Sequence, residues 1–177
     1  MSIDHSSTLI ANRYEMVQGP REKPSLARGM GLVYLCVDHA ENGRPVALKT
    51  FRPELLSDRA ARDCFLREGT TWVELGKHPY IVRCHQVFKV DIGPEVFLIL
   101  ELVAAAEGKN ASLRSRPVTG KLLSVEQVLL FALHIARAMK HAKTKIPDLI
   151  HHDLTGECAG GDKMAMRGCL TLVWRAR

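Results

Sequence analysis

The chain has 177 residues, of which 46% are hydrophobic and 25% are charged, an ordinary composition for a soluble globular protein. Its formal net charge is +6, but no block of like charges occurs, which argues against a nucleic-acid-binding or membrane-binding tail. No secretory signal is visible at the start, and the longest apolar run, Val96 to Ala106, is broken by Glu101 and too short to span a bilayer. The five cysteines lie far apart without a Cys-x-x-Cys pair, which favours reduced thiols, a cytoplasmic location and no metal site.

The first part of the chain predicts strands. After a polar lead at residues 1–12, Arg13 to Gln18 is expected to form the first strand. Gly31–Val37 and Pro45–Phe51 are rich in β-branched and aromatic residues, and Asn42-Gly43 between them is a strong hairpin signal. We therefore predict a β-hairpin over residues 31–51.

A helix is predicted next, from about Arg59 to Leu75. Ser57 or Asp58 can cap its first turn, because a side-chain oxygen there accepts from otherwise unpaired backbone amides. Gly76 is expected to end it.

The remaining elements are two strands and a long helix. The strand-like runs are Ile81–Val90 and Val96–Leu102, and a polar segment follows at residues 104–120. Ser124 and Gln127 have the spacing of a capping box, which predicts a helix to about Lys143. Its apolar residues fall on one stripe, which would pack inside a larger core that this chain mostly lacks, so an exposed apolar patch is expected: Val125, Val128, Leu129, Ala132, Ile135, Ala136 and Met139.

Three residues could carry chemistry. Lys49 ends the returning hairpin strand, where an ammonium can be a fixed charge near phosphates, although most strand lysines are solvated. Glu68 lies in the helix expected to pack on that sheet, where its carboxylate either fixes the lysine or is simply exposed. Asp153 follows two histidines, where a loop could present it as a base. A metal site at 151–153 is the competing reading, but adjacent side chains point in different directions and rarely share an ion.

Six ordered motifs carry a family resemblance: Gly29-Met30-Gly31-Leu32-Val33-Tyr34, Val46-Ala47-Leu48-Lys49, Phe65-Leu66-Arg67-Glu68, His78-Pro79-Tyr80-Ile81-Val82, Leu100-Glu101-Leu102-Val103 and His151-His152-Asp153-Leu154. On these motifs the chain resembles the eukaryotic-type protein kinase domain, especially bacterial serine/threonine kinases, over about residues 12–154. The resemblance implies an α+β fold. A small lobe, with a five-stranded antiparallel sheet, one helix and the hinge, would span residues 13–103. A partial large lobe would span residues 104–154, and an anomalous tail residues 155–177.

The resemblance also implies ATP and Mg²⁺ as cofactors and a protein hydroxyl as acceptor. Lys49 would hold the α- and β-phosphates and pair with Glu68, and Asp153 would be the catalytic base. The nucleotide would be bound by the glycine-rich loop, by two residues that sandwich adenine and by the hinge backbone: Gly29 and Gly31, Val33 and Ala47, and Glu101 and Val103.

The chain departs from the family at several positions. Leu26 and Arg28 stand where the family has glycines over the phosphates, and His152 replaces the arginine before the base. Cys158 stands where the metal-binding asparagine is expected, and no Asp-Phe-Gly follows. Since charge neutralisation by Mg²⁺ is central to phosphoryl transfer, little or no catalysis is predicted for the chain as translated.

Residues 155–177 carry another signal when they are read as codons. Leu170 to Ala176 can be encoded as CTG-ACT-TTG-GTC-TGG-CGC-GCN, and a shifted frame of these bases spells Asp-Phe-Gly-Leu-Ala-Arg. Thr155 to Gly160 can be encoded so that the other shifted frame spells Pro-Glu-Asn-Val-Leu-Val. We hypothesise frameshifts in the gene or its record, and the hypothesis fails if the DNA lacks GAC-TTT-GGT in another frame. The alternative is a short divergent tail that caps a kinase fragment.

Three functions are therefore considered. The first is an ATP-binding serine/threonine protein kinase domain, incomplete and inactive as translated. The second is a pseudokinase-like module that binds nucleotide or a partner without catalysis. The third is a small-molecule phosphotransferase, against which the run His78-Pro79-Tyr80-Ile81-Val82 argues.

Overall fold

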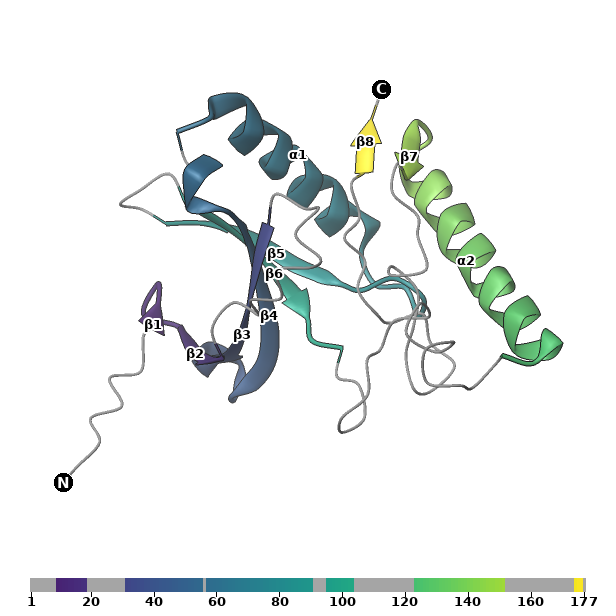
Figure 1. Ribbon diagram of the computed structural model, residues 1–177, viewed down its shortest axis with the longest axis horizontal. Helices are drawn as coiled ribbons and strands as arrows, with labels where there is room; N and C mark the ends of the chain where they lie inside the picture. Colours follow the sequence, from purple (N-terminus) through teal and green to yellow (C-terminus); the bar gives the residue numbers. More distant parts are fainter. Residues whose placement is uncertain are drawn as a thin grey trace. The chain divides into compact units, whose positions relative to one another are not determined.

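The computed structural model describes residues 9–18, 31–55, 57–90, 95–103, 123–151 and 174–176 (Figure 1). The chain divides into two compact units. The first comprises Met1–Gly69 and Cys84–Leu102, and the second comprises Thr70–Arg83 and Val103–Arg177. No described helix combines the length and the apolar character needed to cross a bilayer.

The first unit contains a six-stranded antiparallel sheet with the order β1-β2-β3-β4-β6-β5 (Figure 1). Its strands are β1 (Leu9–Ile10), β2 (Tyr14–Gln18), β3 (Gly31–Asp38), β4 (Arg44–Phe51), β5 (Cys84–Lys89) and β6 (Val96–Glu101). Together with the helix that contacts it, this sheet confirms the predicted small-lobe fold.

Strand β1 is the difference from the predicted five strands, because it lies inside the segment expected to be a polar lead. Ala11 and Asn12 both adopt left-handed backbone conformations, with φ of 54° and 52°. The Arg13 amide donates to the Ile10 carbonyl at 3.2 Å, which closes a tight turn between β1 and β2. The pair Ala-Asn is a weak hairpin signal beside Asn-Gly, so the sequence pattern did not reveal this turn.

The β3–β4 hairpin was predicted and is confirmed, with register from Gly31 opposite Phe51 to Asp38 opposite Arg44. A short 3₁₀ helix, η1 (His39–Glu41), follows β3. Asn42 and Gly43 then close the turn with φ of 53° and 72°, a region that asparagine and glycine tolerate.

A buried carboxylate stabilises the same turn. Asp38 is fully buried and accepts two hydrogen bonds from the Arg13 guanidinium, at 2.7 and 2.9 Å. It also accepts from the Ala40 amide at 3.1 Å, and Arg44 lies 3.5 Å away. The hydrogen bond from Arg13 holds the pKa of Asp38 below its usual range, since it favours the ionised form.

The two faces of the sheet have different roles. Successive residues of a strand point to opposite faces. One face carries a buried core cluster from β2, β3, β4 and β6: Tyr14, Cys36, Val46, Leu48, Phe97 and Ile99. The other face contacts helix α1 through Lys49 and Phe51 of β4 and Leu98 of β6.

Helix α1 (Arg59–Leu75) has the predicted bounds. Of the two predicted caps, Asp58 is the one used, and its carboxylate accepts from the amides of Ala60 and Ala61 at 2.9 and 3.1 Å. Gly76 ends the helix with φ of 65°, as expected for a glycine in this position. A short 3₁₀ helix, η2 (Pro53–Leu55), precedes it.

The strand predicted to begin at Ile81 begins later in the structure. Residues His78 and Ile81 form an isolated bridge instead, and β5 begins only at Cys84. The Trp72 indole donates to the Val82 carbonyl at 2.7 Å, which holds the turn against the end of α1.

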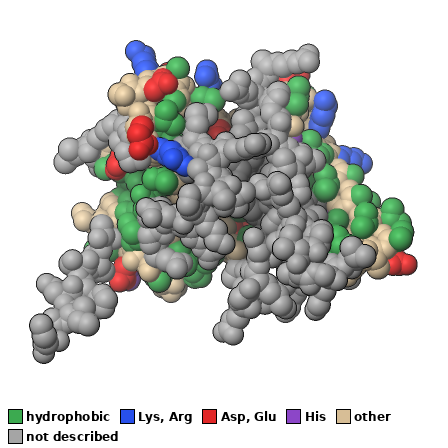
Figure 2. Space-filling model, viewed as in Figure 1, with side chains coloured by type: hydrophobic (Ala, Val, Ile, Leu, Met, Phe, Trp, Pro, Cys, Tyr) green, Lys and Arg blue, Asp and Glu red, His purple; other side chains and the backbone are tan. Residues whose placement is uncertain are grey.

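Helix α2 (Val125–Lys145) begins with the predicted capping box between Ser124 and Gln127. Its buried residues are His134, Ala138 and Ala142, which lie four residues apart on one face. The predicted apolar stripe lies largely elsewhere, and its members Val125, Val128 and Leu129 are 71%, 51% and 64% exposed. Figure 2 shows hydrophobic side chains along this helix.

A two-stranded sheet follows α2. Strand β7 (Leu149–His151) pairs antiparallel with β8 (Trp174–Ala176). The described part of the tail is therefore held by main-chain hydrogen bonds to the strand that leads toward Asp153. Asp153 itself, and the rest of the tail, lie outside the described residues.

Candidate functional site

The centre of the candidate site is an ion pair between sheet and helix. Lys49 near the end of β4 and Glu68 in α1 are only 7% and 9% exposed. The Lys49 Nζ donates to Glu68 Oε1 at 2.8 Å. A buried charge is costly unless it is paired, so each side chain makes the burial of the other tolerable. The structure thus brings together two of the three residues that the sequence singled out for chemistry.

Two aromatic rings pack beside the same ion pair. The Phe65 ring centroid lies 5.7 Å from Lys49 Nζ, within the range of a cation–π contact. Phe51 packs edge-on against Phe65, with ring centroids 5.3 Å apart. Phe65 and Glu68 are three residues apart on α1, so one helical face supplies both contacts to Lys49.

An apolar surface extends from Lys49 along the sheet. Val33 lies directly opposite Lys49 in the β3–β4 pair, and directly opposite residues share a face. Ala47 lies two residues before Lys49 and therefore also shares that face. Val33 is 48% exposed and Ala47 is half-buried, so apolar surface lies open to solvent beside a fixed cation.

The other predicted nucleotide-binding residues are placed only in part. Glu101 ends β6 opposite Val46, and Gly31 begins β3 opposite Phe51. Val103 belongs to the second unit. Gly29 lies outside the described residues, as Asp153 does.

Cys84 is a neighbour of the ion pair that the sequence did not single out. It is 2% exposed, and burial raises the pKa of its thiol to about 12, with Lys49 and Glu68 acting in opposite directions. The thiol is therefore neutral near pH 7 and adds no charge beside the pair. Its only sequence signal was its position in a strand-like apolar run.

Metal ligation has no support in the described residues, which contain no group of three or more histidine, cysteine or acidic side chains able to hold an ion. This finding does not extend to Asp153 or Cys158, which lie outside them.

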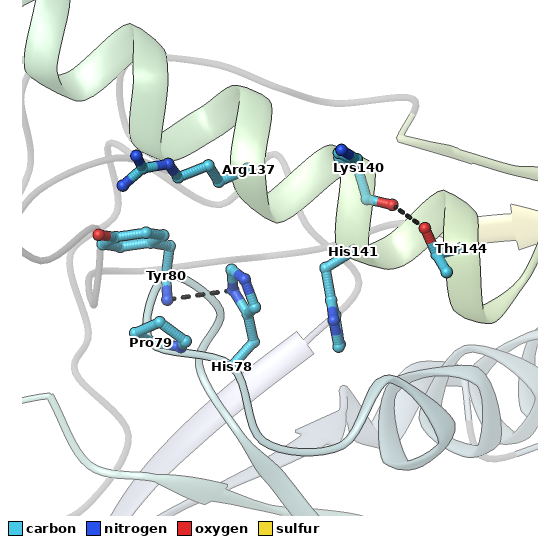
Figure 3. Close-up of a pocket in the computed structure, with 7 residues that line it drawn as sticks. All are labelled: His78, Pro79, Tyr80, Arg137, Lys140, His141 and Thr144. Carbon is cyan, nitrogen blue, oxygen red and sulfur yellow. Dashed lines mark hydrogen bonds between the residues drawn. The ribbon is translucent and has the colours of Figure 1, made fainter.

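A separate pocket of about 470 Å³ lies in the second unit, where the 78–80 turn meets α2 (Figure 3). Three of the residues that line it belong to stacked pairs of rings. His78 stacks on His141 at 4.5 Å between centroids, and Tyr80 stacks on His134 at 3.9 Å. None of the predicted site residues lines this pocket, so we assign it to packing of the helix on the turn.

Two histidines at this turn–helix junction, His134 and His78, have lowered pKa values. Burial lowers the pKa of His134, and nearby Arg137 lowers it further. His134 Nδ1 is buried without a hydrogen-bond partner in the described part of the chain. Burial and the neighbouring His141 likewise lower the pKa of His78.

Comparison with known proteins agrees with this architecture. A family model described as protein tyrosine and serine/threonine kinase matches residues 25–158, which is more than half of the chain. Among the solved structures that match is a mutant of the PknI kinase domain of Mycobacterium tuberculosis, with 25% sequence identity and a TM-score of 0.63. The match covers 90% of this chain but only 58% of the solved one. The chain belongs to the protein tyrosine and serine/threonine kinase family.

Proposed function

We propose that the chain is an ATP-binding domain of the serine/threonine protein kinase type and that it transfers little or no phosphate as its sequence stands. The observation that carries the proposal is the buried 2.8 Å pair between Lys49 and Glu68. A lysine held by a carboxylate keeps its ammonium in one place, and in this family such a pair must be formed for the phosphates to be held.

The residues around the pair suit a nucleotide. Lys49 would hold phosphate oxygens, for which a compact ammonium is a suitable partner. Val33 and Ala47 offer apolar surface for the adenine ring on the same face of the sheet. Gly29 and Gly31 would cover the phosphates, and the backbone at 101 and 103 would bond the adenine edge.

The same proposal expects little or no phosphoryl transfer, because of the residues in the predicted catalytic loop and after it. Asp153 would accept the proton of the acceptor hydroxyl. Magnesium supplies charge neutralisation at the phosphates, but it prefers oxygen ligands, and the expected asparagine position holds Cys158. The residues present do not fit this ion, so we assign no step to it.

Nucleotide binding is tested by isothermal titration of the whole chain with ATP, with and without Mg²⁺. We expect saturable binding that Lys49→Ala abolishes. The matched control is Lys89→Ala, because Lys89 is an exposed lysine at the end of β5. Equal binding by both variants would show that the pair is not the phosphate site.

Phosphoryl transfer is tested with labelled ATP and a generic acceptor protein. Binding without transfer is the result that the proposal predicts. It would also favour the pseudokinase-like alternative, which is supported by the retained ion pair and by the replaced metal ligand. Transfer at about 1–100 s⁻¹, the usual rate for kinases, would overturn the predicted inactivity. Asp153→Asn would then show whether the predicted base is responsible.

A protein acceptor and a cytoplasmic location complete the proposal. The described cysteines Cys36, Cys64 and Cys84 are all free, which fits a reducing compartment. Whether the missing motifs survive in other reading frames is a separate question, and the DNA around codon 154 and beyond answers it.

A further inference from the structure

Gly69 of α1 lies close against the sheet. A Cβ atom built at this position would overlap Leu98 Cδ2 and would lie 2.8 Å from Val87 Cγ2. Real side chains do not tolerate such separations without movement. The backbone of α1 therefore contacts the β5–β6 surface directly at Gly69.

The residues beneath Gly69 belong to the same row of the sheet as Lys49. Leu98 lies directly opposite Lys49 in the β4–β6 pair, and Val87 lies directly opposite Leu98 in the β5–β6 pair. Directly opposite residues point to one face, so this row presents Val87, Leu98 and Lys49 to α1 side by side. Gly69 follows Glu68 in the helix and sits on the row next to the lysine that Glu68 binds.

The row offers little room for a larger residue. Leu98 is fully buried, and Val87 is β-branched and stiff at its first torsion angle. Glycine is also among the poorest helix formers, so helix propensity alone would favour alanine in this interior position. The close approach gives a physical reason for a glycine at this point of α1.

We propose that Gly69 is a positioning residue for the Lys49–Glu68 pair: its missing side chain lets α1 approach β5 and β6 closely enough for the Glu68 carboxylate to reach Lys49. A side chain at 69 would lift this turn of the helix from the sheet and separate the pair. The consequence for ATP rests on the proposed function, whereas the consequence for the pair does not.

The first test uses Gly69→Ala in the whole chain and measures how fast an amine-reactive acetylating reagent modifies Lys49, by peptide mass spectrometry without nucleotide. We expect Lys49 labelling to rise by roughly tenfold, which corresponds to about 1.4 kcal/mol of lost protection. The matched control is Thr70→Ala, which changes the exposed neighbouring position on the same helix. Unchanged Lys49 labelling in a folded Gly69→Ala variant would overturn the proposal.

A second variant separates positioning from general loss of structure. Leu98→Ala removes the nearer of the two atoms that the new methyl group would meet, so Gly69→Ala/Leu98→Ala should bring Lys49 labelling most of the way back to the level of Leu98→Ala alone. Labelling that stays high in the double variant, at the same unfolding midpoint as Leu98→Ala, would also overturn the proposal.

ATP titration adds an arm that depends on function. Gly69→Ala should weaken binding in parallel with the rise in Lys49 labelling, and the double variant should recover both. If the wild-type chain binds no ATP, the proposed function fails, and the labelling experiment still decides the role of Gly69.

Discussion

Removing the negative charge of Glu68 should destabilise the fold far more than breaking a surface ion pair. The side chains of Lys49 and Glu68 are only 9% and 11% exposed, so Glu68→Gln leaves a buried ammonium without its counter-charge. The loss of one partner of a buried pair costs about 3–5 kcal/mol. Because both side chains retain slight exposure, we expect Glu68→Gln to lower the free energy of unfolding by about 3 kcal/mol, the lower end of this range.

Urea unfolding followed by circular dichroism measures this loss. A decrease of about 3 kcal/mol moves the midpoint down by roughly 1–3 M for the usual dependence on urea. The double variant Lys49→Met/Glu68→Leu removes both charges, and replacing a whole buried pair by apolar side chains is often nearly neutral. We therefore expect its stability within about 1 kcal/mol of wild type, with ATP binding lost.

Two results would refute this reasoning. A cost below about 1 kcal/mol for Glu68→Gln is the value of an exposed pair and would mean that solvent reaches the site. A double variant as unstable as Glu68→Gln would mean that the uncompensated charge of Lys49 is not what destabilises the single variant.

Three further predictions concern other parts of the molecule. Asp38→Asn should cost about 2 kcal/mol in urea unfolding, because Arg13 donates two hydrogen bonds to that carboxylate. The control variant Asp63→Asn changes an exposed carboxylate and should alter the free energy of unfolding by less than about 0.5 kcal/mol. If Asp38→Asn and Asp63→Asn have equal effects, the role assigned to Asp38 is wrong. The lowered pKa of His134 means that its contribution to stability is complete above about pH 6.5 and is lost as pH falls below that value. His134→Phe should therefore reduce the drop in unfolding midpoint between about pH 7.5 and about pH 5, and an unchanged drop would exclude this histidine. Leu129 is 64% exposed on α2 with Val125 and Val128, and we expect this apolar patch to make the chain self-associate. Leu129→Glu should therefore reduce self-association in sedimentation experiments without lowering the melting temperature. If the wild-type chain and Leu129→Glu associate equally, the apolar patch is not the cause of the self-association.

The sequence predicted those elements whose signals are local. Asn42-Gly43 specified the hairpin turn, and Asp58 with Gly76 specified both ends of α1. The proximity of Lys49 and Glu68 was also expected, because the family resemblance carried a contact that separate segments could not reveal by themselves.

The remaining features depend on tertiary packing. The buried residues of α2 include His134, which stacks on Tyr80, a contact that no local pattern predicts. The apolar stripe is largely exposed, as expected where the core that would cover it is mostly lacking. Helix propensity alone disfavours the glycine at Gly69, and only the row of the sheet beneath it gives a reason for that residue. Burial of Cys84 beside the ion pair likewise depends on how three strands align, which no local pattern specifies.

The most direct test of the nucleotide site is labelling with an ATP analogue that carries an acyl group on its terminal phosphate. A lysine amine close to the bound phosphates attacks the acyl carbon, keeps the acyl group and releases ATP. We predict that Lys49 is acylated ahead of exposed lysines such as Lys77 and Lys89, and that excess ATP suppresses its labelling alone. Acylation spread evenly over the exposed lysines, with no protection of Lys49 by ATP, would contradict the account.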